Sequence, residues 1–112
     1  MTTRILTAAL LLAITPFAMA ASGDIEAGKT KAQMCQSCHG EDGNGVGQGD
    51  YPLLAGQHAD YLFKALTDYK SGRRNNPIMA GFAATLSEQD MHDLAAYFAS
   101  QTGPLSDLSA LK

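Results

Sequence analysis

Two cysteines and one histidine stand close together early in the chain and could share one chemical task. Cys35, Cys38 and His39 form a C-x-x-C-H sequence, the spacing typical of covalent haem attachment. Two thiols three positions apart on a helical turn can each add to one vinyl group of the same porphyrin, and the adjacent imidazole then lies under the iron. The motif therefore predicts one haem c bound through Cys35 and Cys38, with His39 as a ligand of the iron.

The cysteine pair has two alternative interpretations, a redox-active disulfide and a zinc site. A thioredoxin-type disulfide would lie at the start of a helix after a strand, and the sequence shows no βαβ pattern. A structural zinc site needs four ligands, whereas the other histidines, His58 and His92, have no finger-like spacing to the cysteines. A thiol-disulfide oxidoreductase is therefore the alternative from a different functional class.

A six-coordinate haem needs a second axial ligand, and several side chains of suitable type have another explanation. Met34 is adjacent to the attachment point, on the wrong side to reach over the ring. Met91 falls on the inner face of a predicted helix, where core packing explains it. His92 is expected to point toward water, and His58 stands at the start of a helix, where a capping or surface role is expected.

Met79 is the candidate that these explanations leave. It follows Asn76 and Pro77 and precedes Gly81, so we expect it in a non-helical loop that folds across the far face of the porphyrin. A thioether in that position favours ferrous iron and raises the reduction potential, while a filled sixth site keeps oxygen away from the metal. We therefore predict His39 and Met79 as the two axial ligands.

The first twenty residues are expected to direct export. Arg4 precedes an apolar stretch at residues 5–17, and small residues lead up to Ala20, which is the order of a secretory signal cleaved after Ala20. The stretch is shorter than the roughly 20 residues that span a bilayer, so no stable membrane insertion is expected after cleavage. Residues 1–20 are thus predicted to be a signal peptide and residues 21–112 one periplasmic domain.

The predicted domain is small and mildly acidic. Removal of the signal changes the formal net charge from −3 to −4, because the signal carries one of the eight Lys and Arg residues and none of the eleven Asp and Glu residues. A nucleic-acid-binding surface needs a clustered basic face, so no nucleic-acid partner is expected. Such a short chain buries a modest share of its apolar surface, and a bound cofactor would enlarge its core.

Three helical segments are predicted, and no strand pattern competes with them. They cover residues 24–34, residues 59–71, and a third segment that begins at Ser87 and is ended by Gly103 and Pro104. Ser87 and Asp90 form a variant of the capping box, and Gly72 stands where the second helix would stop. The fold class is therefore all-α, and the third helix is expected to turn four apolar side chains inward: Met91, Leu94, Ala95 and Phe98.

These motifs resemble those of a known family, the class I cytochromes c, and within it a single domain of the cytochrome c4 and c553 type. The matching stretches are residues 35–45 (CQSCHGEDGNG), 51–57 (YPLLAGQ), 60–72 (DYLFKALTDYKSG) and 76–98 (NPIMAGFAATLSEQDMHDLAAYF). Together they cover most of the chain after the signal. The resemblance implies three main helices around one covalently bound haem, with the first and last helices crossing.

The resemblance also implies roles for individual residues. Pro52 matches the family proline whose carbonyl accepts a hydrogen bond from the proximal imidazole, here His39, and Met79 matches the distal methionine. Gly28 matches the small residue at the helix crossing, with Phe98 as its aromatic partner. The sequence departs from cytochrome c4 in one respect, because c4 proteins carry two such domains in tandem and a single C-x-x-C-H is present here.

The function that follows is electron transfer between redox protein donors and acceptors in the periplasm. The alternative within the same class is a haem c subunit of a periplasmic dehydrogenase such as flavocytochrome sulfide dehydrogenase, whose cytochrome subunit also resembles this sequence. No catalytic base, nucleophile or substrate pocket is identified, so no enzyme activity of its own is expected. Lys70, Arg73 and Arg74 form a basic cluster that either steers docking to an acidic partner or is ordinary solvated surface.

Overall fold

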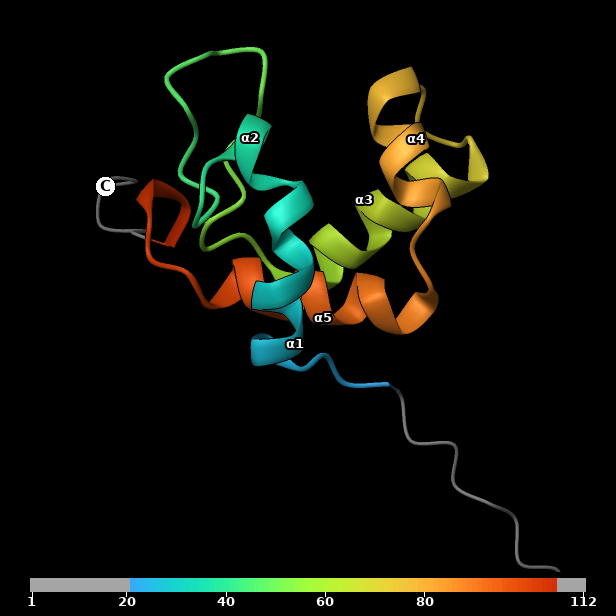
Figure 1. The fold of residues 1–112 in the computed structure, drawn as a ribbon, viewed down its shortest axis with the longest axis horizontal. Helices are drawn as coiled ribbons and strands as arrows, with labels where there is room; N and C mark the ends of the chain where they lie inside the picture. Colours follow the sequence, from blue (N-terminus) through green and yellow to red (C-terminus); the bar gives the residue numbers. More distant parts are fainter. Residues whose placement is uncertain (1–20, 107–112) are drawn as a thin grey trace, which may run out of the picture.

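The computed structural model describes residues 21–106, and the predicted signal peptide with its cleavage point after Ala20 lies outside this part of the chain (Figure 1). All regular structure within residues 21–106 is helical, which confirms the all-α class. None of the helices in this range has the length and apolar character needed to cross a membrane. The elements are α1 (Ile25–Lys31), the 3-10 turn η1 (Ala32–Met34), α2 (Gln36–His39), α3 (Ala59–Ser71), α4 (Pro77–Ala84), α5 (Glu88–Ser100) and the 3-10 turn η2 (Pro104–Ser106).

The helix ends follow local signals in the sequence. The side chain of Asp24 accepts a hydrogen bond from the Ala27 N–H at 2.8 Å and caps α1. Ser87 and Asp90 form both hydrogen bonds of the predicted capping box at the start of α5. Gly72 ends α3 in the left-handed conformation, with φ at 82°. α5 itself stops at Ser100, before the predicted Gly103 and Pro104.

The prediction that Met79 lies in a loop is wrong, because it lies in the first turn of α4. The side chain of Asn76 accepts hydrogen bonds from the N–H groups of Ile78 at 3.0 Å and Met79 at 3.1 Å. Pro77 occupies the first helical position, where its missing N–H costs nothing. The Asn-Pro pair that was expected to break the helical pattern therefore starts a helix.

The crossing of α1 and α5 forms the base of the molecule (Figure 1). Gly28 allows this close approach, because a Cβ atom there would lie 2.1 Å from the Asp93 carbonyl oxygen and 2.7 Å from the Tyr97 Cβ. The aromatic partner at the crossing is thus Tyr97, and the expectation of Phe98 is wrong. Phe98, one position further along α5, turns toward Gly43 in the loop after α2.

α5 forms the centre of the core, with α1 and α3 packed against it and α4 packed on α3. All four side chains predicted to face inward are buried, so Met91 is a core residue. The expectation that His92 points toward water is wrong, because its ring stacks on Phe63 with centroids 4.0 Å apart. The buried residues of the hydrophobic core are Ala32, Leu62, Leu86, Met91, Leu94, Ala95, Tyr97 and Phe98.

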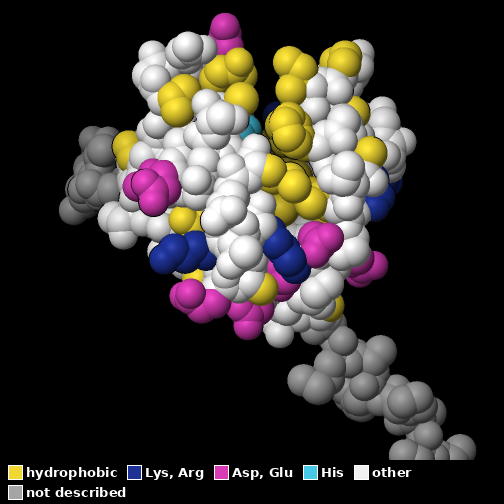
Figure 2. Space-filling view, viewed as in Figure 1, with side chains coloured by type: hydrophobic (Ala, Val, Ile, Leu, Met, Phe, Trp, Pro, Cys, Tyr) yellow, Lys and Arg dark blue, Asp and Glu magenta, His cyan; other side chains and the backbone are white. Residues whose placement is uncertain are grey.

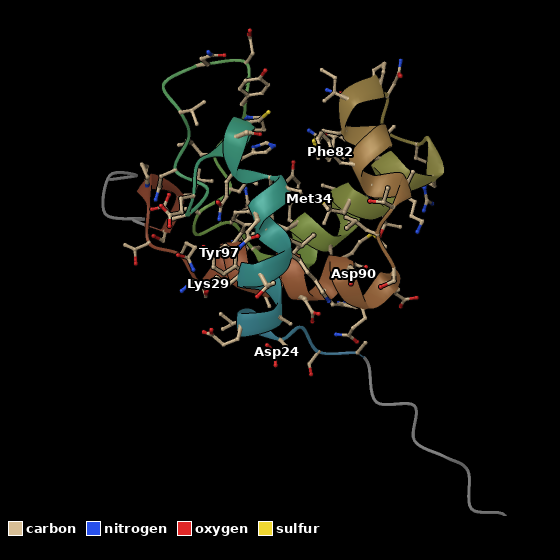
Figure 3. All side chains as sticks on the ribbon, in the orientation of Figure 1. Asp24, Lys29, Met34, Phe82, Asp90 and Tyr97 are labelled. Atoms are coloured by element: carbon tan, nitrogen blue, oxygen red, sulfur yellow. The ribbon has the colours of Figure 1, made fainter. Side chains whose placement is uncertain are left out.

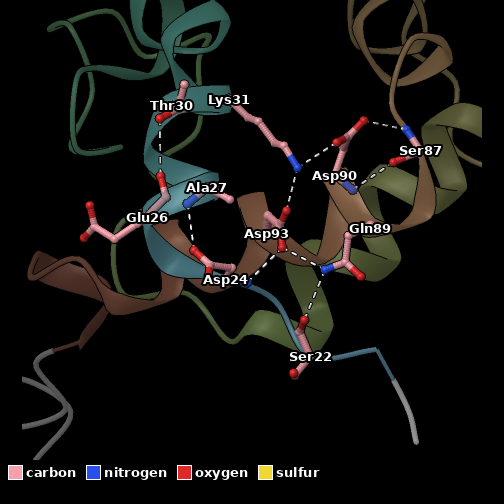
Figure 4. A network of polar contacts seen from close by, with 10 residues as sticks. All are labelled: Ser22, Asp24, Glu26, Ala27, Thr30, Lys31, Ser87, Gln89, Asp90 and Asp93. Carbon is pink, nitrogen blue, oxygen red and sulfur yellow. Dashed lines mark hydrogen bonds and ion pairs between the residues drawn. The ribbon is translucent and has the colours of Figure 1, made fainter.

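An ion-pair network joins α1 to α5 beside the crossing (Figure 4). The Lys31 ammonium lies 2.8 Å from a carboxylate oxygen of Asp90 and 2.5 Å from one of Asp93. Asp93 is only 2 % exposed, and its other oxygen accepts hydrogen bonds from the Asp24 N–H and the Gln89 amide, both at 2.8 Å. Groups from both helices thus hydrogen-bond the buried carboxylate. These bonds offset the free-energy cost of burying its charge in an otherwise apolar contact.

The network lowers the pKa of both carboxyl groups. The hydrogen bond from Lys31 lowers the pKa of Asp90 to about 2. The backbone N–H of Asp24, followed by the Lys31 ammonium, lowers the pKa of Asp93. A carboxylate with a depressed pKa in the folded state stabilises the fold above its unfolded pKa, near 4, and this stabilisation is lost as the pH falls toward the folded pKa.

Replacing Gly28 by Ala should lower the free energy of unfolding by about 1–3 kcal/mol, the usual cost of overpacking. The gain in helix propensity, about 1 kcal/mol, is smaller, and the clashing atom belongs to a rigid backbone carbonyl. Urea denaturation of the haem-loaded protein measures this. Gly49→Ala is the control, because nothing lies within 4 Å of a Cβ at Gly49, and equal stability of the two variants would contradict the close crossing.

Replacing Asp93 by Asn should lower the free energy of unfolding by about 2 kcal/mol at pH 7, since hydrogen bonds to a charged group are lost. The deficit relative to wild type should persist above pH 4 and shrink as the pH falls toward 2, because wild type then loses the same carboxylate contribution. Urea denaturation at a series of pH values tests this, with the exposed Asp50→Asn as control. If the variant stays less stable than wild type by the same amount down to pH 2, the charge of Asp93 is not the source of its stabilising effect.

Candidate haem site

α2 brings the two cysteines onto one turn of helix. The Cys35 carbonyl accepts hydrogen bonds from the N–H groups of Cys38 at 3.3 Å and His39 at 2.9 Å. Both thiols are free and half-buried, and Cys35 packs against the core cluster. Burial, with a smaller contribution from Cys38, raises the pKa of the Cys35 thiol to about 11. One turn therefore carries two thiols at the spacing that attachment to a single porphyrin requires.

His39, the last residue of α2, is held in one orientation. Its side chain is buried, and Nδ1 lies 2.8 Å from the Pro52 carbonyl oxygen. A carbonyl oxygen only accepts hydrogen bonds, so Nδ1 must carry the proton and Nε2 keeps its lone pair available for a metal. Such a contact both orients an imidazole ligand and increases its electron donation.

The loop after α2 returns Pro52 to His39. The Gly45 N–H donates to the His39 carbonyl at 2.7 Å, and the Gly43 carbonyl accepts from the Leu54 N–H at 2.8 Å. These two bonds close the loop on either side of its exposed tip. The position of the Pro52 carbonyl is thus fixed by backbone contacts, and its side chain takes no part in the bond to the imidazole.

A cleft of about 460 Å³ separates the α2 side of the molecule from α4. Figure 2 shows it as a hollow between two lobes whose facing surfaces are largely hydrophobic, and Figure 3 places Met34 and Phe82 on opposite sides of it. Large apolar side chains are rarely this exposed around a hollow without an occupant. Its lining consists of Met34, which is 44 % exposed, Ile78 at 61 %, Phe82 at 40 %, Gly81 and Thr85.

The residues present fit a haem group. Free thiols on one turn, an imidazole with an available Nε2 and an apolar cleft beside them together meet the needs of covalent attachment, axial ligation and burial of a porphyrin. A zinc ligand set is not found in the part of the chain that the structure describes, because no group of three His, Cys, Asp or Glu side chains within residues 21–106 is arranged to hold a metal ion.

The predicted site residues come from three separate parts of the fold. Cys35, Cys38 and His39 lie together around α2, and Pro52 contacts His39 from the following loop. Met79 is half-buried on α4, the helix that supplies most of the cleft lining. Sequence reasoning missed the lining residues on α4. An Asn cap and a Pro in the first position, followed by an apolar run, were the signals that could have revealed this helix.

Comparisons with known proteins agree with this geometry. The family model for cytochrome c matches residues 25–102. Cytochrome c4 of Pseudomonas aeruginosa is 49 % identical over 82 % of this chain and 45 % of its own length. A thiosulfate dehydrogenase electron acceptor of Stutzerimonas stutzeri is 42 % identical over 87 % of this chain and 46 % of its own. The crystal structure of reduced cytochrome c4 from Pseudomonas stutzeri superposes with a TM-score of 0.69 at 44 % identity, covering 73 % of this chain and 47 % of that one.

The helical fold, the C-x-x-C-H turn and the apolar cleft define a class I c-type cytochrome. The chain belongs to the cytochrome c family of electron-transfer proteins and is related to cytochrome c4. It carries haem c through Cys35 and Cys38. The chain spans about half the length of the two curated relatives named above.

Proposed function

We propose that this protein is a periplasmic electron carrier whose haem iron is ligated by His39 and Met79. The single observation that carries the proposal is the 2.8 Å contact between His39 Nδ1 and the Pro52 carbonyl, which leaves Nε2 as the nitrogen able to bind iron. Bound haem supplies a one-electron couple between ferric and ferrous iron. The chain's own side chains determine where that couple sits and at what potential.

Each site residue has a distinct task in this proposal. Cys35 and Cys38 hold the porphyrin by thioether bonds, and His39 binds the iron on the α2 side with its electron donation increased by Pro52. Met79 binds on the α4 side, where a soft thioether favours the ferrous state and blocks access of oxygen. The apolar lining of the cleft excludes water, which likewise disfavours the more highly charged ferric state.

Met79 is supported as the distal ligand by its place in the fold. Met34 of η1, just before the attachment turn, lines one side of the cleft and α4 lines the other, and Met79 belongs to the first turn of α4. Met91 is buried in the core and His92 is stacked on Phe63, so neither is available to the cleft. Met34 lines the cleft from the α2 side, the side of the attachment point.

Export to the periplasm is proposed from the signal-like first twenty residues and the attachment motif. Redox proteins are the expected partners. The name of one relative, a thiosulfate dehydrogenase electron acceptor, favours a dehydrogenase as the donor. This observation also supports a second candidate, a haem c subunit held permanently by such an enzyme. Purification from the periplasm separates the two, since a subunit co-purifies with its enzyme and a carrier does not.

Replacing Met79 by Ala should open the sixth coordination site of the purified oxidised protein. The weak absorption band at the red end of the spectrum, assigned to sulfur on ferric iron, should disappear, and the reduction potential should fall by tenths of a volt, on the order expected for loss of an axial ligand. Met34→Ala is the matched control and should keep the band. If the band survives in the Met79 variant, another residue is the ligand.

A further inference from the structure

The first turn of α4, which carries Met79, is held by one residue. The side-chain oxygen of Asn76 accepts hydrogen bonds from the N–H groups of Ile78 and Met79. The Asn76 carbonyl accepts a third bond, from the N–H of Ala80 at 2.8 Å. Pro77 has no N–H to donate. Every backbone N–H group of this turn therefore bonds to Asn76, including that of Met79 itself.

The backbone of Asn76 is already arranged for this role by the proline that follows it. It is extended, with φ at −154° and ψ at 110°. A helix cap needs this conformation, and a residue before proline favours it. Because the proline acts on the backbone, a substitution of the Asn76 side chain should remove the cap and leave the course of the chain unchanged.

α4 has little other support at this end. Its one buried residue is Ala83, in the last turn of the helix, and among the helices α4 packs chiefly on α3. Eight residues are too few to form a stable helix alone, and little buried surface compensates for this. The first turn of α4 therefore depends strongly on its cap.

The basic cluster near the end of α3 fixes the chain on either side of α4. The Lys70 ammonium donates to the Leu86 carbonyl, just after α4. The Arg74 N–H donates to the Asp68 carbonyl at 3.1 Å, and Arg73 Nε lies 3.3 Å from a carboxylate oxygen of Asp68. Lys70 and Arg73 thus each have a partner within the chain, which favours a structural role for this cluster over steering of an acidic partner.

We propose that Asn76 is a positioning residue for the iron ligand: its cap holds the first turn of α4, so that the Met79 thioether resists displacement by an external ligand. The inference rests on the proposed ligation of the iron by Met79. A thioether leaves the iron when its side chain turns away or when the turn that carries it unwinds, and the cap opposes unwinding. Loss of the cap therefore makes displacement easier without removing any atom that touches the iron.

Imidazole is the probe for this test, because its nitrogen is a good ligand for iron. The nitrogen lone pair replaces the sulfur at ferric iron, so one bond forms, one breaks, and no electron or proton is transferred. Titration of the oxidised holoprotein is followed by loss of the weak absorption band at the red end of the spectrum. The apparent Kd for imidazole should be at least about fivefold lower in Asn76→Ala than in wild type, the factor that corresponds to one typical helix cap.

Three further variants separate positioning from a general loss of stability. Ser87→Ala removes the corresponding cap from α5, where Ser87 Oγ accepts a hydrogen bond from the Asp90 N–H at 3.1 Å. It should lower the stability in urea about as much as Asn76→Ala does, yet bind imidazole as wild type does. Asn76→Ser keeps a cap of similar strength and should restore wild-type affinity, whereas Asn76→Thr, with a weaker cap, should lie between the other two variants. The Thr variant also supplies the comparison if Asn76→Ala does not take up haem.

Equal imidazole affinity in wild type and the Asn76 variants would overturn the positioning role and leave the ligation by Met79 intact. An equal gain of affinity in Ser87→Ala would also overturn it, because any loss of stability would then have the same effect. A wild-type protein without the red band, or a Met79→Ala variant that keeps it, would contradict the proposed ligation and this inference together.

Discussion

The contact between His39 Nδ1 and the Pro52 carbonyl is the constraint on which the site depends. It selects one tautomer of a buried imidazole and thereby decides which nitrogen can bind a metal. A second hydrogen bond holds the neighbouring backbone in place. The Tyr97 hydroxyl donates to the Glu41 carbonyl at 3.1 Å and so connects the residues after His39 to α5. The same Tyr97 packs on Gly28, which links the orientation of the imidazole to the crossing of α1 and α5.

The two ends of the molecule have different roles: the crossing of α1 and α5 stabilises the fold, and the cleft end binds the cofactor. The crossing of α1 and α5 combines close backbone packing with the ion-pair network of Lys31, Asp90 and Asp93, and these contacts are made between protein atoms. At the cleft end, Ile78 and Phe82 present apolar surface that a bound porphyrin would cover. A small chain buries little apolar surface of its own, so an apolar group bound in this cleft would add to the free energy of folding.

Local signals made much of the fold predictable from the sequence. The capping box at Ser87, the stop at Gly72 and the inward face of the last helix depend on neighbouring residues, and all three were confirmed. α4 was missed because Asn and Pro before a helix were interpreted as a break. Two errors concerned the rotation of α5 about its own axis: His92 stacks on Phe63, and Tyr97 takes the place expected for Phe98. The spacing of apolar residues defines the buried face of a helix, but it does not define the rotation closely enough to choose between neighbouring residues. The ion-pair network joins residues some sixty positions apart, a distance over which the sequence carries no local signal.

The position of the proton on the His39 ring in the ferrous holoprotein is the decisive test of how this imidazole is held. A long-range proton–nitrogen NMR correlation spectrum of protein labelled with nitrogen-15 in histidine distinguishes the two ring nitrogens. The hydrogen bond to Pro52 predicts a slowly exchanging proton on Nδ1, and no proton is expected on Nε2, because the iron would occupy that position. A proton on Nε2, or a freely exchanging imidazole, would contradict it.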